Sequence, residues 1–406
     1  MSTVVRAGTF IDGNGGAPKR DVNIHLEGDS IVKIGGEIPR GATVIDRSSE
    51  TVMPGMIDCH VHLWSTPGSI EERLQKPYSL NVAEAFRNAK ITLDAGFTTV
   101  RDAAGTPLGV KQAIDRGMVP GPRLRIAVGA LSQTSGHGDS RFASGVTGRV
   151  DDPEHPWTVV DGVEAVRKAT RELLRAGADQ IKVHTSGGVM SPSDEPTSTG
   201  FSPDEIAAIV YEAHAAGKTV MTHSQATQGI RNAVEAGIES IEHGIYLDAD
   251  TAELMKKKGI YLVATLIAPL WVQRRAERKP GSVPAYAVRK ANEVVDAHQK
   301  MFQMAVKMGV PIAMGTDTGV GEHGTNAEEL ELMVKLGMTP MQAIVATTKT
   351  AAACARVGKI TGTLEPGKRA DLIAVAGDPI ADIAILQRAE CITLVMRDGQ
   401  VFKQLA

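Results

Sequence analysis

From Met56 onward, the sequence alternates short apolar runs with longer segments of helical periodicity. Two of the helical segments are 81–96 (NVAEAFRNAKITLDAG) and 202–217 (SPDEIAAIVYEAHAAG). The apolar runs with β-strand character are 55–60, 98–103, 123–129, 180–185, 219–224, 240–244, 261–266 and 311–317. This alternation is typical of repeated β/α units built on a parallel sheet, and eight strands is the number that closes such a sheet into a barrel. We therefore predict an α/β fold, a (β/α)8 barrel of the TIM type.

Both chain ends carry short β-like runs separated by glycine and proline. The runs 22–28 and 30–36 precede the barrel, and similar runs follow Arg356 up to Ala406. Neither end is long enough to bury a good core by itself. We predict that the two ends combine into one small β-sandwich domain, residues 1–55 and 359–406, beside a barrel that spans 56–358.

Two helix starts can be placed from local sequence alone. Ser202 is followed by Pro203, with Glu205 three residues after the serine, which is the pattern of a capping box. Thr339 followed by Pro340 opens another helix in a similar way. These two positions fix the register of the helical segments that follow them.

The charge balance excludes one class of partner. The chain has 44 Lys and Arg against 47 Asp and Glu, a formal net charge of -3, so it lacks the basic surface that nucleic-acid binding requires. The longest apolar run, Tyr261 to Trp271, is too short to span a bilayer, and the amino terminus lacks the pattern of a secretory signal. Three scattered cysteines, Cys59, Cys354 and Cys391, argue against a disulfide framework. We expect a cytoplasmic protein with reduced thiols and a small-molecule substrate, and no nucleic-acid or membrane partner.

His60 and His62 lie two residues apart at the end of the first predicted barrel strand. The pleat of a strand points residues i and i+2 to the same side, so the two imidazoles can share one cation. A pair of histidines on a core face explains the same spacing. The pair alone therefore does not decide between a metal site and packing.

Other nitrogen and oxygen donors fall at the ends of other predicted strands. His223 ends the fifth strand, His243 the sixth and Asp317 the eighth, while Lys182 lies within the fourth. Active sites of parallel barrels gather at the carboxyl ends of the strands. We therefore expect these side chains to meet His60 and His62 at one place, although each has a structural explanation when taken separately.

Lys182 has two interpretations. It can pair with a nearby acid such as Asp102. Beside histidines and an aspartate, however, a protonated amine would repel cations, whereas a lysine carboxylated by carbon dioxide offers two anionic oxygens that can bridge two metals. We also interpret the neighbours Arg101 and Asp102 as an ion pair that supports the site.

Several motifs together resemble the amidohydrolase superfamily, in the branch of imidazolonepropionase-like proteins and metal-dependent Xaa-Pro and Xaa-Arg dipeptidases. The motifs are PGMIDCHVHL, GFTTVRDAAG, LSQTSGHGD, QIKVHTSGGVMSP, MTHS, IEHG, MGTDTG and GTLEPGKRADL, which extend from the first barrel strand to near the carboxyl end. The resemblance implies two divalent cations, with zinc the expected metal for nitrogen and oxygen ligands. It implies that one buried cation binds His60, His62 and Asp317, that a more exposed one binds His223 and His243, and that carboxylated Lys182 and a hydroxide bridge the two.

The resemblance also implies catalytic roles for two residues. Metal ions lower the pKa of a bridging water, and Asp317 is placed to move its proton to the leaving nitrogen. His137, in SGHGD, matches the donor to the developing oxyanion; the alternative is a loop histidine that faces water. His184 shares a side of its strand with Lys182, and we expect it to support the metal ligands or simply to pack beside them.

Substrate recognition departs from the family pattern. In the dipeptidases, a tyrosine two residues after the fifth-strand histidine helps to bind substrate, and here that position is Gln225. An amide is a less specific partner for a peptide carboxylate than a phenol or a cation, so we expect Tyr246 to compensate. The segment 187–200, which starts with two glycines, reads either as a mobile loop over the site or as an ordinary surface loop.

We therefore predict a metal-dependent hydrolase of a small-molecule amide, with a dipeptide or N-acyl amino acid as the expected substrate. A urea, carbamate or cyclic amide is the alternative substrate class, and a catalytically inactive metal-binding protein is the alternative from another functional class. Within the enzyme class, a single-metal site with unmodified Lys182 is a further alternative. A homo-oligomer is expected by analogy with such folds.

Overall fold

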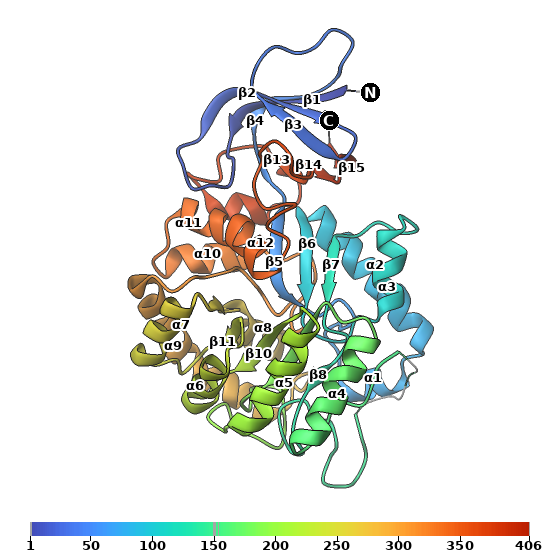
Figure 1. The fold of residues 1–406 in the computed structure, drawn as a ribbon, viewed down its shortest axis with the longest axis vertical. Coiled ribbons are helices and arrows are strands. Elements are labelled where there is room, and N and C mark those ends of the chain that lie inside the picture. Colours follow the sequence, from blue (N-terminus) through green and yellow to red (C-terminus); the bar gives the residue numbers. More distant parts are fainter. Residues whose placement is uncertain (1, 149–151, 153, 406) are drawn as a thin grey trace.

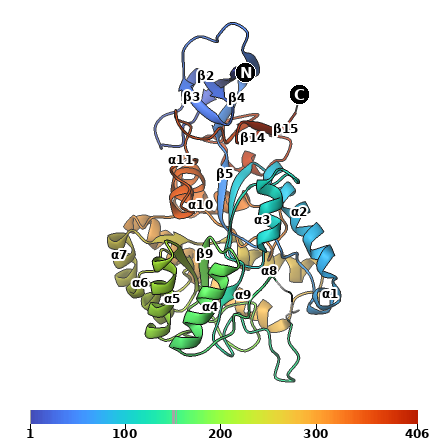
Figure 2. The same ribbon diagram turned by 45° about the vertical axis from the view of Figure 1, so that its right-hand side comes forward.

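Strands from both chain ends form one sheet at the end of the molecule where the two termini lie (Figures 1 and 2). The computed structural model describes residues 2–148, 152 and 154–405. The sheet has the order β15-β14-β13-β4-β1-β2-β3. Its strands are β1 (Ser2–Phe10), β2 (Lys19–Glu27), β3 (Ser30–Ile34), β4 (Thr43–Pro54), β13 (Leu372–Val375), β14 (Ile392–Arg397) and β15 (Gln400–Gln404). Only the β1·β4 pair is parallel among them.

The predicted union of the two chain ends is thus confirmed, but the expected two-sheet sandwich is not found in the described residues. Strand β4 explains the difference, because it is long enough to pair with both halves. It pairs with β1 through Thr43–Val52 and with β13 through Thr51–Pro54, so hydrogen bonds join the two halves into one continuous sheet. The exact domain boundaries stay predictions, and Met1, residues 149–151 and 153, and Ala406 lie outside the described residues.

The larger part of the chain contains two parallel sheets. One has the order β5-β6-β7 and the other β12-β11-β10-β9-β8. The strands are β5 (Met56–Val61), β6 (Phe97–Asp102), β7 (Arg123–Ile126), β8 (Ala130–Leu131), β9 (Gln180–His184), β10 (Thr219–Ser224), β11 (Ser240–His243) and β12 (Tyr261–Val263). Seven of the eight predicted barrel strands are therefore present, and the parallel β/α architecture is confirmed.

The eighth predicted strand, 311–317, is irregular, and the described residues do not form one closed eight-stranded sheet. The segment still lies between the two sheets. Ala313 N donates to Leu262 O in β12 at 3.0 Å, and Cys59 N in β5 donates to Met314 O at 2.9 Å. The segment forms only isolated bridges, Ile312 with Leu262 and Thr318 with Val61, and between them Asp317 has a φ of 64°, in the left-handed region.

Helices cover the outer faces of the two parallel sheets (Figure 1). They are α1 (Ile70–Gln75), α2 (Tyr78–Asp94), α3 (Leu108–Asp115), α4 (Val163–Arg175), α5 (Pro203–Ala215), α6 (Thr227–Ala236), α7 (Ala249–Lys258), α8 (Ile267–Arg278), α9 (Ala285–Met308), α10 (Glu328–Lys335), α11 (Pro340–Val345) and α12 (Ala351–Cys354), with a π-helical turn at Ala346–Thr350 and a 3-10 helix at Ile383–Gln387. The predicted helix starts at Ser202 and Thr339 are both confirmed, and each has a capping box. In the part of the chain that the structure describes, no helix is both long and apolar enough to cross a membrane.

Burial of the central strands positions polar side chains inside the molecule. Every residue of β5 and β6 is buried, as expected for parallel strands whose outer face packs against helices. The side chains that alternate to the inner face include His60, Arg101, Lys182 and Glu242, each at most 3% exposed. Because buried polar groups require partners, these inner side chains are the place to look for a functional site.

An ionic contact joins the terminal sheet to the α/β part. Arg123 on β7 bonds to Asp371 through Nη1 and to Asp398 through Nη2, the latter at 2.6 Å. Asp371 is buried, and the two positive-to-negative contacts raise the pKa of Arg123 despite its own burial, which acts in the opposite direction. Arg123 therefore gives the buried Asp371 side chain a cationic partner.

We predict that Arg123→Met lowers the free energy of unfolding by about 3 kcal/mol, because a buried carboxylate loses its cation. Arg388→Met is the matched control. Arg388 pairs with Asp382 at 3.3 Å with both side chains about half exposed, and such a pair contributes about 1 kcal/mol or less. Urea denaturation followed by circular dichroism measures both changes, and equal small losses would contradict the proposed role of Arg123.

Candidate metal centre

The sequence-predicted ligands lie on or just after four strands of the two parallel sheets and on the irregular segment 311–317. His60 is on β5 and His62 follows it, Lys182 is on β9, His223 on β10 and His243 at the end of β11. Asp317 lies in the irregular segment beside β5, where its backbone N–H donates to His60 O at 2.7 Å. All six line one cavity of about 300 Å³.

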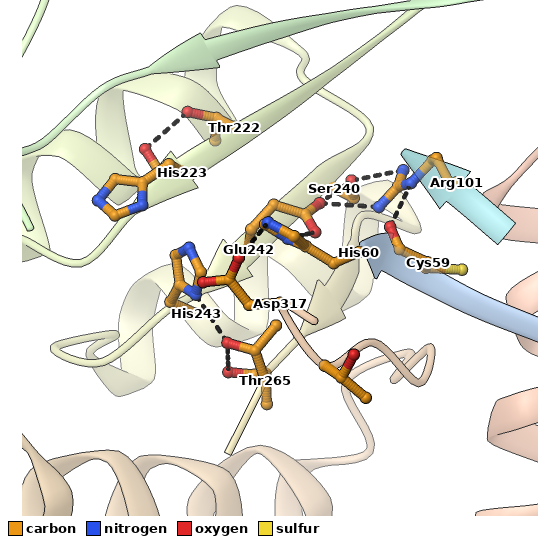
Figure 3. Close-up of polar contacts among 12 residues, drawn as sticks. Cys59, His60, Arg101, Thr222, His223, Ser240, Glu242, His243, Thr265 and Asp317 are labelled. Carbon is orange, nitrogen blue, oxygen red and sulfur yellow. Dashed lines mark hydrogen bonds and ion pairs between the residues drawn. The ribbon is translucent and has the colours of Figure 1, made fainter. Parts of the chain in front are cut away.

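Asp317 lies close to the rings of His60 and His243 (Figure 3). Its Oδ1 atom is 3.1 Å from His62 Nε2 and 3.5 Å from His60 Nε2. His60, His243 and Asp317 each offer one ligand atom, and these atoms lie within 4.8 Å of one another. The ring centroids of His223 and His243 are 4.6 Å apart. The structure thus brings together side chains that could hold a metal ion.

The hydrogen bonds of the four histidines decide which ring nitrogen faces the cavity. In each ring, one nitrogen is bonded to an acceptor in the surrounding protein. The bonds run from His60 Nδ1 to Glu242 Oε2 (2.8 Å), from His62 Nδ1 to Ala104 O (2.9 Å), from His223 Nε2 to Gly187 O (3.0 Å) and from His243 Nδ1 to Thr265 Oγ1 (2.7 Å).

These acceptors fix the ring protons. Carbonyl and carboxylate oxygens only accept, and the Thr265 hydroxyl donates to Ala264 O at 2.7 Å, so its oxygen accepts from His243. In the neutral rings of His60, His223 and His243, the bonded nitrogen therefore carries the proton, and the other nitrogen keeps its lone pair. Such an arrangement is the one found where histidines ligate metals, so these residues fit a metal centre. His62 differs, because its Nε2 also lies 3.1 Å from Asp317 Oδ1.

Electrostatics favours the same protonation states. Burial lowers the pKa of His60 to about 4 and also lowers the pKa of His223 and His243, so these rings are neutral near pH 7. Burial opposes ionisation of Asp317, but the surrounding imidazoles outweigh it and lower the pKa of this carboxyl group. For His62, the contact with Asp317 outweighs burial and raises the pKa. His60, His223 and His243 are therefore neutral nitrogen donors, and Asp317 is an anionic oxygen donor.

Lys182 lines the same cavity and is only 2% exposed. Burial lowers the pKa of its amine to about 8. The alternative pairing with Asp102 is not found: Asp102 accepts instead from Leu63 N and the Thr106 hydroxyl. Within the described residues, Lys182 Nζ has no hydrogen bond or ion pair. It is therefore a buried amine on the cavity wall without a polar partner among these residues.

Sequence analysis missed Glu242 and assigned the wrong partner to Arg101. Arg101 Nη2 donates to Glu242 at 2.9 Å rather than pairing with Asp102, because adjacent residues on a strand point to opposite faces. Glu242 is fully buried and also accepts from His60 and the Ser240 hydroxyl. Burial raises the pKa of Glu242, but Arg101 and His60 outweigh it and lower the pKa to about 2. The sequence signal that could have revealed this residue is a glutamate inside the predicted strand 240–244.

His137 reaches the cavity from the loop after β8 (Ala130–Leu131). Its ring stacks on His223 with centroids 4.0 Å apart and an interplanar angle of 12°. Its Nδ1 is 3.0 Å from Ser191 Oγ. The Ser191 hydroxyl donates to Asp194, so its oxygen accepts from His137 Nδ1, and Nε2 is the nitrogen left for the cavity. Burial lowers the pKa of His137 to about 4, although the charge of Asp194 acts in the opposite direction.

Of the three remaining residues that were expected at the site, two line a cavity and one does not. Gln225 lines a small recess of about 50 Å³ beside His223 and His243, and its Oε1 is buried without a partner among the described residues. Tyr246 packs instead against the apolar cluster that contains Ile245, and the described lining of the two cavities does not include it. His184 lines the larger cavity next to the rings of His137 and His223.

Comparison with known proteins identifies the relatives of this arrangement. Residues 51–402 match the model of the amidohydrolase family. Ochratoxinase from Aspergillus niger is 36% identical over 99% of this chain and 86% of its own length. A crystal structure of a Xaa-Pro dipeptidase with bound methionine superposes with a TM-score of 0.91 at 33% identity, covering 99% of this chain and all of the other. A prolidase complexed with N-methylphosphonate-L-proline gives 0.92 at 32%, covering both chains fully. The branch expected from the sequence motifs is confirmed.

We predict that Glu242→Gln lowers the affinity for Zn²⁺ by about 10–100-fold, as for other groups that orient a metal-binding histidine. The amide brings two N–H donors into a position that already receives three donors, so His60 loses its fixed orientation. Competition with a chromophoric chelator measures the affinity. Glu239→Gln is the control, since Glu239 lies just before the same strand and bonds to His214 at 2.9 Å, away from the cavity. Unchanged zinc affinity in Glu242→Gln would count against the assigned role.

Proposed function

The chain belongs to the amidohydrolase family, and from that membership we propose that it is a metal-dependent hydrolase of an amide bond in a small molecule. The observation that carries the proposal is that His60, His243 and Asp317 each offer a ligand atom within 4.8 Å of one another. The cavity that holds them is also lined by His62, Lys182 and His223. Dipeptides and N-acyl amino acids are the proposed substrates. The relatives named Xaa-Pro dipeptidase and prolidase support this class, because they match the chain over its whole length.

We assign the residues that would hold the metal as follows. His60, His62 and Asp317 would hold one cation and His223 and His243 a second, with a carboxylated Lys182 between them. The free amine of Lys182 in the same cavity supports this assignment. When bound, such cations lower the pKa of water and polarise the substrate carbonyl. We take the two parallel sheets to be the two parts of one (β/α)8 barrel, whose active site lies at the carboxyl ends of its strands.

The reaction adds water to the carbonyl carbon and breaks the carbon–nitrogen bond. Asp317 is the residue that takes the proton of the attacking water and delivers it to the leaving nitrogen. His137 presents Nε2 to the carbonyl oxygen. Donation from Nε2 requires a second proton on this ring, which is neutral near pH 7 because burial lowers its pKa to about 4. The ring takes up that proton from solvent water, and the Asp194 carboxylate, connected through Ser191, and the negative charge that develops on the oxygen stabilise the imidazolium.

The small recess beside His223 is suited to the apolar part of a substrate. Its walls include Ile245, Pro269 and Val272, and the side chain of Gln225 also lines it. Ligand sites typically combine such apolar walls with a few polar groups that fix orientation. We therefore assign Gln225, rather than Tyr246, to substrate binding.

We predict that the zinc-loaded protein hydrolyses N-acyl amino acids or dipeptides, and that Asp317→Asn lowers kcat by about 10²–10⁴-fold, the usual contribution of general acid–base catalysis. Release of the free amino acid from a substrate panel that includes ureas and lactams measures this activity. Asp382→Asn, at an exposed aspartate, should leave kcat unchanged. Full activity of Asp317→Asn would refute the role of Asp317 in proton transfer. If only ureas or lactams react, the proposed substrate class is wrong and the alternative class replaces it.

We predict that a chelator abolishes this activity and that zinc restores it, with two zinc ions per chain. Lys182→Met should hold fewer ions, because it cannot be carboxylated. Elemental analysis counts the metal, and a carbamate signal from protein prepared with ¹³C-labelled bicarbonate reports the modification. Lys218→Met is the control, at a lysine in a separate surface pocket. One ion per wild-type chain and no carbamate signal would favour the single-metal alternative.

A further inference from the structure

A buried lysine outside the candidate metal centre has no role so far. Lys290 lies on α9 and is 1% exposed. A lysine this buried requires partners for its three N–H groups. All of them are in one loop: Nζ donates to Gly188 O at 3.1 Å, to Ser191 O at 2.9 Å and to Asp194 O. Asp194 Oδ1 is also 3.7 Å from Nζ.

The loop that Lys290 holds is the one that contacts His137. Ser191 accepts from His137 Nδ1 and donates to Asp194, and Asp194 Oδ1 in turn accepts from Gly188 N at 3.1 Å. The loop backbone also lies against the rings. A Cβ atom at Gly188 would be 2.4 Å from His137 Cε1 and 2.8 Å from His223 Cε1. A shift of the loop by a few tenths of an ångström therefore moves the ring of His137.

The other polar contacts between α9 and the loop are weaker. Arg289 pairs with Glu195, but both side chains are about half exposed, and exposed pairs contribute little to stability. Tyr286 Oη donates to Met190 O at a long 3.3 Å. Val189 of the loop also belongs to a buried apolar cluster with residues of α9, and the contacts of Lys290 are the buried polar contacts that hold the loop to this helix.

We propose that Lys290 is a positioning residue for the reaction, which acts through the loop Gly188–Asp194 to orient His137 over the cavity. This inference rests on the proposed function, in which His137 binds the substrate oxygen. Lys290 itself touches no substrate. Its effect should appear in kcat more than in KM, because the hydrogen bond from His137 strengthens as charge develops.

The test is a double-mutant cycle between Lys290→Met and His137→Ala in the zinc-loaded protein. Methionine keeps the length of the side chain and removes the donors. We expect Lys290→Met to lower kcat by about 10–100-fold, with KM changed less than about threefold, since the loss of one oriented hydrogen-bond donor costs about 10²–10³-fold. In the His137→Ala background, the same substitution should lower kcat by less than about threefold. An equal loss in both backgrounds, or no loss in either, overturns the proposal.

A readout without catalysis separates this inference from the proposed function. Hydrogen exchange of the peptides that cover 187–194 should become at least tenfold faster in Lys290→Met and stay unchanged in Lys300→Met, the control at an exposed lysine of the same helix. If no amide substrate is found, faster exchange still supports the loop contact, whereas unchanged exchange refutes it. If amides are hydrolysed and Lys290→Met has the wild-type kcat, the inference fails while the function stands.

Ser191→Ala keeps the proposal testable should Lys290→Met fail to fold. It leaves the contacts of Lys290 with the backbone carbonyls intact and removes the hydroxyl between Asp194 and His137. We expect a similar loss in kcat, absent in the His137→Ala background. Wild-type kcat in Ser191→Ala would overturn the proposal.

Discussion

The structure depends on a carboxylate that is buried in the interior between the two parallel sheets. Glu242 on β11 accepts hydrogen bonds from Arg101 on β6, from His60 on β5 and from its neighbour Ser240. Arg101 completes its own donors with bonds to Cys59 O and Ser240 Oγ. Removing one partner from such a buried ion pair leaves an uncompensated charge. The contacts of Glu242 join the two sheets and also fix the His60 ring. The fold and the candidate metal centre are therefore stabilised by the same interactions.

Much of this arrangement could be predicted from the sequence, because two of the rules that relate sequence to this fold depend on local patterns. Apolar runs of strand length alternate with helical segments, and donors at strand ends converge when the strands are parallel. These rules place His60, His62, His223 and His243 correctly at the carboxyl ends of their strands. The same rules predicted a regular strand for 311–317, where they were wrong.

The failures concern features that only tertiary contacts determine. Gly315 lies so close to β12 that a Cβ there would be 2.4 Å from Val263 Cγ1, and Asp317 leaves the extended conformation. The segment 311–317 pairs with its neighbours only irregularly. The partner of Arg101 lies 141 residues away in the sequence. Lys290 reads in the sequence as one more lysine of an amphipathic helix, and nothing local distinguishes it from the exposed Lys300.

Backbone strain explains why α9 has to hold both sides of the cavity. His243, Thr265 and Asp317 all have left-handed φ values, of 70°, 53° and 64°, which cost about 1–3 kcal/mol each for residues other than glycine. Such conformations persist only where surrounding contacts impose them. His298 on α9 bonds through Nε2 to His243 O at 3.1 Å and to Ala264 O at 2.8 Å, which are the carbonyls beside two of the strained residues. Lys290, two turns earlier on the same helix, fixes the facing loop, so one rigid helix sets the distance between the strained strand ends and the loop that contacts His137.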